Sequence, residues 1–373
     1  MEKIKVALQQ RVIPNYRVPF FEKLGQRPEI ELSIFSGLPR PQEMIEIAKN
    51  ISNVNFVKGK NIHLFDKRFY ICLQPGIHQW LREYDPDVVI LEANPRYLSS
   101  RKAIQWIKKE GKGLIGWGLG VPNHSGKLSK IVSETRFQFL RNFDEIIAYS
   151  KHGKQQYVKA GIPEEIIHIA PNSTAPKPDF PPPIREQVFQ NGRAILLFVG
   201  RLQTRKRVDS LIRACAQISE DQQPDLWVVG DGLILNDLKS YANLNYPRTK
   251  FWGAVYGKEL EEIFKRADLF VLPGTGGLAI QQAMSYALPV IVAEGDGSQS
   301  NMVFPENGWI IPANDENVLV STIKKAISDP AELREMGNNA YDIIANHINI
   351  DIMTEVFITS IIETFKLRNK YGR

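Results

Sequence analysis

The chain of 373 residues is longer than one ordinary hydrophobic core, so the length predicts two domains of roughly 180 residues each. An apolar fraction of 43% and a charged fraction of 24% are those of a globular protein and exclude a mostly disordered chain. The net charge of +6 is unevenly spread: residues 1–180 carry 27 Lys and Arg against 18 Asp and Glu, and residues 181–373 carry 20 against 23. A basic half is typical of proteins that bind nucleic acid, an anionic membrane or a phosphorylated substrate.

The sequence shows no sign of secretion or membrane insertion, so we expect a cytoplasmic protein. The N-terminal residues lead directly into a short strand-like run, with no long apolar segment of the kind a signal peptide contains. No apolar run approaches the ~20 residues that span a bilayer. Cys72 and Cys215 lie far apart in apolar surroundings, as expected of buried, reduced thiols.

Short apolar runs alternate with helix-like stretches along the whole chain. Most runs have four to six residues and little alternation, which is typical of strands buried on both faces of a parallel sheet. Helix-like stretches such as 208–219, 259–267 and 315–328 separate them, so the pattern predicts an α/β protein. The predicted strands are 5–8, 31–35, 88–91, 113–117, 145–149 and 166–170 in the first half, and 194–199, 226–229, 250–252, 269–272, 290–292 and 309–311 in the second.

A proline-rich stretch separates the two halves. Residues 175–184 contain five prolines and no apolar periodicity, which favours a stiff, extended linker. We therefore predict a first Rossmann-like domain over 1–174, a linker over 175–190, a second Rossmann-like domain over 191–348, and a helix with a basic tail over 349–373. A cleft between two such domains is the expected place for a site.

Two loops of the second half carry the strongest signals for chemistry. The run 198–209 is a buried strand that ends at Gly200 and continues into a cationic loop with Arg201 and Lys206. The run 272–284 is a strand that ends in a glycine-rich turn and opens a helix. Ligands of open α/β sheets bind at the carboxyl ends of the strands, where cations and free helix N–H groups hold phosphates. The alternatives are a solvated basic loop and a tight turn without a ligand.

These loops are two of four motifs that occur in the order of a known family. The sequence resembles the retaining GT-B glycosyltransferases of family 4, the glycosyl transferases of group 1, closely over about 190–345 and more loosely in the first half. The first half contributes the pieces 9–20, 94–99, 117–120 and 147–172. The four motifs are G-R-L-x-x-x-K at 200–206, V-G-x-G at 229–232, F-x-G-x-V at 251–255 and G-L-x-x-x-Q-A-M at 277–284.

The resemblance implies a role for each matching residue. Arg201 and Lys206 would be the catalytic cations that hold the diphosphate, with Gly200 beside them. The backbone of Gly277, Leu278 and Ala279 would cradle the distal phosphate, Gly253 and Val255 would contact the base, and Gln282 would bind the ribose. The donor sugar would lie against Gly274, Thr275 and Gly276. The acceptor side would comprise Arg11, Asn15, Tyr16, Arg17, Trp117 and His124, with Trp117 as either a core residue or a sugar-stacking platform.

Several positions depart from the family pattern, among them the first turn, where Gln10 and Arg11 stand in place of a frequent Gly-Gly pair. Gly274 and Gln282 stand where the family usually has two Glu residues, so either the donor sugar differs or Thr275 and backbone groups take over. Leu119 stands where the family usually has a His, and His124 is a substitute or a surface loop residue. No metal is expected, because Asp85 and Asp87 precede their strand and so lie at the amino edge of the sheet.

The resemblance implies a GT-B fold whose C-terminal helix returns to the first domain, and a retaining transferase without a cofactor. It would move a hexose-type sugar from a nucleotide-diphosphate sugar to a glycan or lipid-linked acceptor in bacterial surface polysaccharide synthesis, such as lipopolysaccharide, O-antigen or capsule. The basic first half favours peripheral contact with an anionic membrane at the inner face of the cell, and no nucleic acid. The alternatives are an epimerase of the same fold, with Glu92 and Glu294 as its few candidate carboxylates, and a degenerate, non-catalytic protein.

Overall fold

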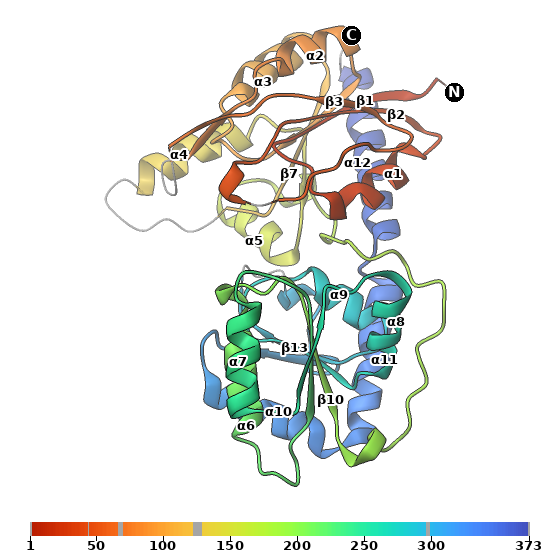
Figure 1. Ribbon diagram of the computed structural model, residues 1–373. Coiled ribbons are helices and arrows are strands. Elements are labelled where there is room, and N and C mark those ends of the chain that lie inside the picture. Colours follow the sequence, from red (N-terminus) through yellow and green to blue (C-terminus); the bar gives the residue numbers. More distant parts are fainter. Residues whose placement is uncertain (1, 44, 66–69, 122–128, 296–298, 372–373) are drawn as a thin grey trace. The chain divides into compact units, whose positions relative to one another are not determined.

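The computed structural model describes residues 2–43, 45–65, 70–121, 129–295 and 299–371, and it divides into two compact units (Figure 1). Unit 1 comprises residues 1–174 and 350–373, and unit 2 comprises residues 175–349. The predicted α/β architecture with two parallel sheets is confirmed. No helix in the described ranges is long and apolar enough to cross a bilayer.

Unit 1 is built on a seven-stranded parallel sheet in the order β3-β2-β1-β6-β7-β8-β9. A separate antiparallel pair, β4 and β5, lies outside this sheet. The strands are β1 (Ile4–Gln10), β2 (Ile30–Ser36), β3 (Asn55–Lys58), β4 (Ile62–Leu64), β5 (Ile71–Leu73), β6 (Val88–Glu92), β7 (Gly113–Gly118), β8 (Glu145–Ala148) and β9 (Ile167–Ile169). The helices are α1 (Val18–Gly25), α2 (Ile77–Tyr84), α3 (Ser99–Lys109), α4 (Ser129–Leu140), α5 (Lys151–Lys159) and α12 (Ile350–Tyr371).

Successive residues of the unit 1 strands fill two separate cores, because side chains alternate between the faces of a sheet. Val88 and Ile90 of β6 pack with Phe357 of α12 on one face. Val89 and Leu91 belong to the core on the other face, with residues of α2 and α3. Both faces are covered, which explains the continuous apolar runs of the sequence.

The C-terminal helix α12 is an integral part of unit 1. Phe357 makes edge-on ring contacts with Phe20 and Trp117, with ring centroids 5.0 and 4.9 Å apart. At the helix end, Arg368 donates a 3.0 Å hydrogen bond to Asp144, at the start of β8. The buried aromatic contacts and the ion pair together hold the end of the chain on the first domain.

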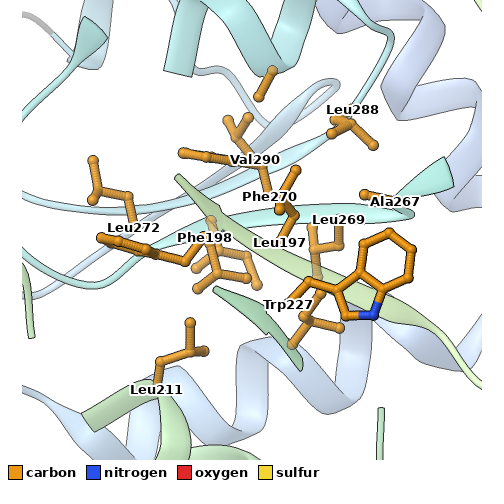
Figure 2. Close-up of a cluster of buried hydrophobic side chains, with 14 of the residues drawn as sticks. Leu197, Phe198, Leu211, Trp227, Ala267, Leu269, Phe270, Leu272, Leu288 and Val290 are labelled. Atoms are coloured by element: carbon orange, nitrogen blue, oxygen red, sulfur yellow. The ribbon is translucent and has the colours of Figure 1, made fainter. Parts of the chain in front are cut away.

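Unit 2 is built on a six-stranded parallel sheet in the order β12-β11-β10-β13-β14-β15. Figure 2 shows its core, in which Leu197 and Phe198 of β10 gather with Phe270 and Val290 of the neighbouring strands. The strands are β10 (Ile195–Val199), β11 (Asp225–Val229), β12 (Thr249–Gly253), β13 (Leu269–Leu272), β14 (Val290–Ala293) and β15 (Gly308–Ile311). The helices are α6 (Val208–Ala216), α7 (Leu235–Asn245), α8 (Gly257–Arg266), α9 (Leu278–Ser285), α10 (Glu316–Ser328) and α11 (Pro330–Asn346).

The segment 175–190, predicted as a linker, packs against unit 2. The Arg185 guanidinium donates four hydrogen bonds of 2.8–3.1 Å to the carbonyls of Phe264, Ala267, Tyr286 and Ala287. These carbonyls lie at the carboxyl ends of α8 and α9, where unpaired C=O groups and the negative helix end attract a cation. Burial lowers the pKa of Arg185 to about 10. The prolines stiffen this segment, and Arg185 attaches it to two helices.

Arg185→Ala should therefore destabilise unit 2 by about 2–4 kcal/mol, because it leaves four partly buried carbonyls unpaired. Lys177→Ala is the matched control, because Lys177 is an exposed cation of the same segment. Chemical denaturation of the two variants and the wild type measures the difference. Equal stability of all three proteins would contradict the role of Arg185.

Candidate functional site

The four motif loops of unit 2 meet at one edge of its sheet. They follow β10, β11, β12 and β13, which are consecutive neighbours in the strand order, and all four strands are parallel. Adjacent loops are joined through their backbones: Gly200 N donates to Val229 O at 3.0 Å, and Gly230 N donates to Gly253 O at 2.7 Å. The motifs therefore form one continuous rim at the carboxyl end of the sheet, where ligands of this architecture bind.

The loop after β10 lies directly on the glycine-rich turn after β13. Thr275 N donates a 3.0 Å hydrogen bond to Arg205 O. A Cβ atom on Gly274 would lie 2.3 Å from Arg205 O and 2.5 Å from the Lys206 carbonyl carbon. These are backbone atoms that cannot swing aside, so this backbone leaves no room for any side chain at 274. The contact explains why glycine stands at this position.

Lys206 is the central cation of this rim. It ends the 3₁₀ turn Thr204–Lys206, and its Nζ lies over the glycine turn, 2.0 Å from where a Cβ on Gly276 would be. Gly276 has φ +135°, which glycine adopts readily. Burial, and secondarily the charge of Arg205, lowers the pKa of Lys206 to about 8. Among the described residues no carboxylate pairs with Lys206, so a bound anion would supply its missing counter-charge.

The three arginines of the loop differ in their surroundings. Arg201 is exposed at the end of β10. Arg205 is also exposed and donates to Gln203 Oε1 at 2.9 Å and to Thr275 Oγ1 at 3.2 Å. Arg207 points elsewhere, because it donates to Asn314 and, at 2.7 Å, to Ser210 Oγ. Arg201, Arg205 and Lys206 are thus the cations placed along the rim, whereas Arg207 stabilises its own loop.

Helix α9 begins at this rim. Gly277 is its N-cap and Leu278 is its first residue. The first backbone N–H groups of a helix, here including that of Ala279, have no partner inside the helix and can bind an anion. Gln282 is half-buried on the same helix. Gly253, with φ +73°, uses its carbonyl to accept from Gly230, and Val255 beyond it is buried. The roles of these residues in ligand binding stay predictions.

Gln299, which no sequence motif singles out, is a buried residue beside the glycine turn. Its Nε2 lies 3.4 Å from Gly276 O and its Oε1 has no hydrogen-bond partner among the described residues. A buried amide with an open acceptor is costly unless something pairs with it. In the sequence, only the glycine-rich stretch 294–298 before Gln299 indicates a loop that could approach a ligand.

A second polar cluster lies at the carboxyl ends of the unit 1 strands. Arg11 N donates to Glu92 Oε2 at 2.7 Å, and the Arg11 guanidinium pairs with Glu43 Oε2 at 2.9 Å. Burial raises the pKa of Glu92 to about 7, against the opposing effect of the nearby Arg11 backbone N–H and charge. Asn15 and Tyr16 are exposed in the turn that follows β1.

Arg17 is buried, although arginine is rarely found inside a protein. Its guanidinium lies over the rings of Trp117 and Tyr149, at 5.1 and 5.5 Å from their centroids. It donates to Asn172 Oδ1 at 2.7 Å, and its Nη1 has no hydrogen-bond partner among the described residues. Trp117 is 1% exposed, so of its two predicted roles the structure supports the core residue and not the stacking platform. His124 lies outside the described residues.

The described residues contain one group with donor atoms close enough for a metal ion: Glu145, His168 and Glu363. His168 Nε2 lies 3.1 Å from Glu145 Oε2, and the Glu145 carboxylate raises the pKa of His168. Glu145 begins β8, so this group lies at the amino end of its strand, away from the Arg11–Glu92 cluster. Asp87 has a structural role, because its carboxylate accepts a 2.8 Å hydrogen bond from the backbone N–H of Lys5.

Comparison with known proteins identifies relatives of this chain. Residues 181–343 match the family model described as "Glycosyl transferases group 1". A GDP-mannose-dependent alpha-mannosyltransferase of Mycobacterium tuberculosis is 28% identical over 63% of this chain and 62% of its own length. Lipopolysaccharide 1,6-galactosyltransferase of Escherichia coli is 24% identical over 77% of this chain and 76% of its own. The matches to the first three curated relatives span 40–62% of their lengths, less than two-thirds.

Solved structures resemble the chain over nearly its whole length. The apo form of the lipopolysaccharide outer core galactosyltransferase WaaB has a TM-score of 0.67 and 18% identity, covering 96% of this chain and 99% of its own. HepE of Anabaena in complex with UDP has a TM-score of 0.65 and 16% identity, and the match covers 97% of this chain and 100% of its own. This likeness shows the fold, which is GT-B with two Rossmann-like domains.

Gly274→Ala should lower stability by about 1–3 kcal/mol, because the added methyl group displaces the 205–206 backbone. It should also weaken the binding of inorganic pyrophosphate, since Lys206 moves with that backbone. Gly192→Ala is the control: Gly192 has φ +70° but open space around it, so only backbone strain is added, away from the rim. Thermal unfolding with and without pyrophosphate measures both effects. If Gly274→Ala behaved like the wild type, the contact would not constrain the loop.

Proposed function

We propose that the protein is a glycosyltransferase that moves a sugar from a nucleotide-diphosphate sugar to a hydroxyl group of an acceptor. The observation that carries the proposal is Lys206, a half-buried ammonium that has no carboxylate partner among the residues the structure describes. Backbone contacts hold it at the start of α9. The match of residues 181–343 to a glycosyltransferase family model supports it. The names of the relatives, which include UDP-galactose-dependent and GDP-mannose-dependent enzymes, also support the proposal.

The chemistry follows from charge. When the bond between the sugar and the diphosphate breaks, the oxygen atom that stays on the diphosphate gains negative charge. Lys206 and Arg201 would neutralise the diphosphate, and the first N–H groups of α9 would donate to its distal phosphate. Because these groups are preorganised by the strand ends and the glycine turn, they stabilise the developing charge without rearranging. In this proposal they do so without a metal ion.

The finer proposal is a retaining hexosyltransferase of family 4 that acts on a glycan or lipid-linked acceptor. In the usual picture of such enzymes the leaving phosphate helps to take the acceptor proton, so no protein base is needed. Relatives named for lipopolysaccharide and diphosphoundecaprenol acceptors support a role in bacterial surface polysaccharide synthesis at the inner face of the cell membrane. Arg11, Asn15, Tyr16 and Arg17 would lie on the acceptor side.

Donor cleavage tests this function. The wild type is incubated with UDP-, GDP- and dTDP-sugars and the released nucleotide is measured, with and without acceptor lipid. We expect release with one nucleotide, and a loss of about 10²–10³-fold in Arg201→Ala and in Lys206→Ala, as for other groups that stabilise transition-state charge. Lys239→Ala, an exposed cation of unit 2, is the control and should keep full activity.

Unchanged turnover in both loop variants would refute the assigned roles. Nucleotide binding without release of nucleotide from any sugar donor would instead favour the non-catalytic alternative. Interconversion of nucleotide sugars without transfer would favour the epimerase, whose candidate carboxylates are Glu92 and Glu294.

A further inference from the structure

Three side chains with metal-ligating atoms converge in unit 1, each from a different element. Glu145 begins β8, His168 lies in β9, and Glu363 lies on α12. His168 Nε2 lies 3.1 Å from Glu145 Oε2 and 3.8 Å from Glu363 Oε2. One donor atom of each side chain lies within 4.8 Å of the other two. Segments that are far apart in the sequence therefore place one imidazole and two carboxylates around a single point.

The spacing of these atoms matches the coordination shell of a small tetrahedral ion. Zn²⁺ binds nitrogen and carboxylate oxygen at about 2.0–2.2 Å, which in a tetrahedron puts neighbouring ligand atoms about 3.4 Å apart. The two distances from His168 Nε2, 3.1 and 3.8 Å, lie on either side of this value. The Glu363 side chain is 51% exposed, so it has room to turn toward the other two ligands. A solvent molecule would complete the four-coordinate shell.

The ring nitrogen at the centre of the group has no hydrogen bond. His168 Nε2 is buried, and no described residue offers it a partner of suitable geometry, although a Glu145 oxygen lies 3.1 Å away. A buried polar atom is costly unless something pairs with it. The nitrogen of a neutral imidazole is also the commonest metal ligand in proteins. This open nitrogen is a second observation, independent of the carboxylates, that points to a ligand.

The nearby cations already have carboxylate partners of their own. Lys154 pairs with Glu164 at 3.2 Å, and Arg368 donates to Asp144 at 3.0 Å. Neither of them is therefore available to balance the two carboxylates of the group. Buried or partly buried charges are stable when they are paired or when they coordinate a metal ion, and one divalent cation would balance both carboxylates.

Helix α12 also orients a ligand that it does not carry. Ser360, fully buried one turn before Glu363, donates its hydroxyl proton to Glu145 Oε2. Such outer partners hold a ligating carboxylate in place and are a regular part of metal sites. The helix therefore supplies one ligand directly and fixes a second one on β8.

We propose that Glu145, His168 and Glu363 bind a zinc ion that fastens the C-terminal helix α12 to strands β8 and β9. Zinc suits a mixed set of imidazole and carboxylate, whereas Ca²⁺ and Mg²⁺ prefer oxygen ligands alone. The group lies at the amino end of β8, so its role is structural. The proposal does not depend on the transferase function, because metal binding is measured without any sugar donor, and each can fail without the other.

The test is equilibrium dialysis of the untagged, chelator-treated full chain against Zn²⁺, followed by measurement of the metal bound per chain. We expect one zinc ion per chain and a higher midpoint of thermal unfolding, because an ion that binds only the folded state stabilises it. Mg²⁺ and Ca²⁺ should cause no shift. His168→Gln and Glu363→Gln should each lower the zinc affinity by about 100-fold or more, and Ser360→Ala by about tenfold.

The matched control is Glu355→Gln, which removes another exposed carboxylate of α12 and its ion pair with Arg27. It should bind zinc like the wild type. Circular dichroism of the metal-free variants checks their fold, and Glu363→Gln keeps the test valid if His168→Gln does not fold, because Glu363 is exposed. Wild-type protein that binds no zinc overturns the proposal, as does zinc binding that Glu363→Gln leaves unchanged. Lower metal-free stability of Glu363→Gln, with no zinc bound by the wild type, would assign the group to an ion pair of protonated His168 instead.

Discussion

The contact between the backbone at Arg205–Lys206 and the glycine turn at Gly274–Gly276 is the constraint on which the unit 2 site depends. It joins the loops of two neighbouring strands, and the Cβ positions show that it tolerates no side chain at 274. The same contact holds the Lys206 ammonium over the turn, where burial lowers its pKa and no described carboxylate balances its charge. A protein keeps a cation in such a place at a cost in free energy, which an anionic ligand offsets.

This contact also changes how the departure from the family pattern is understood. From the sequence, glycine in place of a family Glu indicates either another donor sugar or a weakened site. In the structure the glycine is required by the packing of the loop, and Thr275 holds that loop through its backbone N–H. Position 274 is therefore part of the scaffold of Lys206. In the proposed transferase, donor recognition would fall to backbone groups and to neighbours such as Gln299.

Much of the fold could be predicted from the sequence, because buried parallel strands and amphipathic helices have strong local patterns. The predicted helix 315–328 is α10, over Glu316–Ser328, with Asp315 accepting from Val318 N as its cap. Strand β3 and the β4–β5 pair were missed, because short, half-exposed edge strands lack a continuous apolar run. The burial of Arg17 and the packing of residues 175–190 on unit 2 depend on distant partners, which local patterns do not contain.

The central claim, that Lys206 receives an anionic ligand, is tested most directly by counting protons on binding. Isothermal titration calorimetry with UDP and GDP at about pH 8, in two buffers of different ionisation enthalpy, gives the protons taken up per site. Since the pKa of Lys206 is about 8 and a bound diphosphate raises it, the account predicts uptake of about half a proton. In Lys206→Met that uptake should vanish. Binding without proton uptake, or equal uptake in Lys206→Met, would contradict the account.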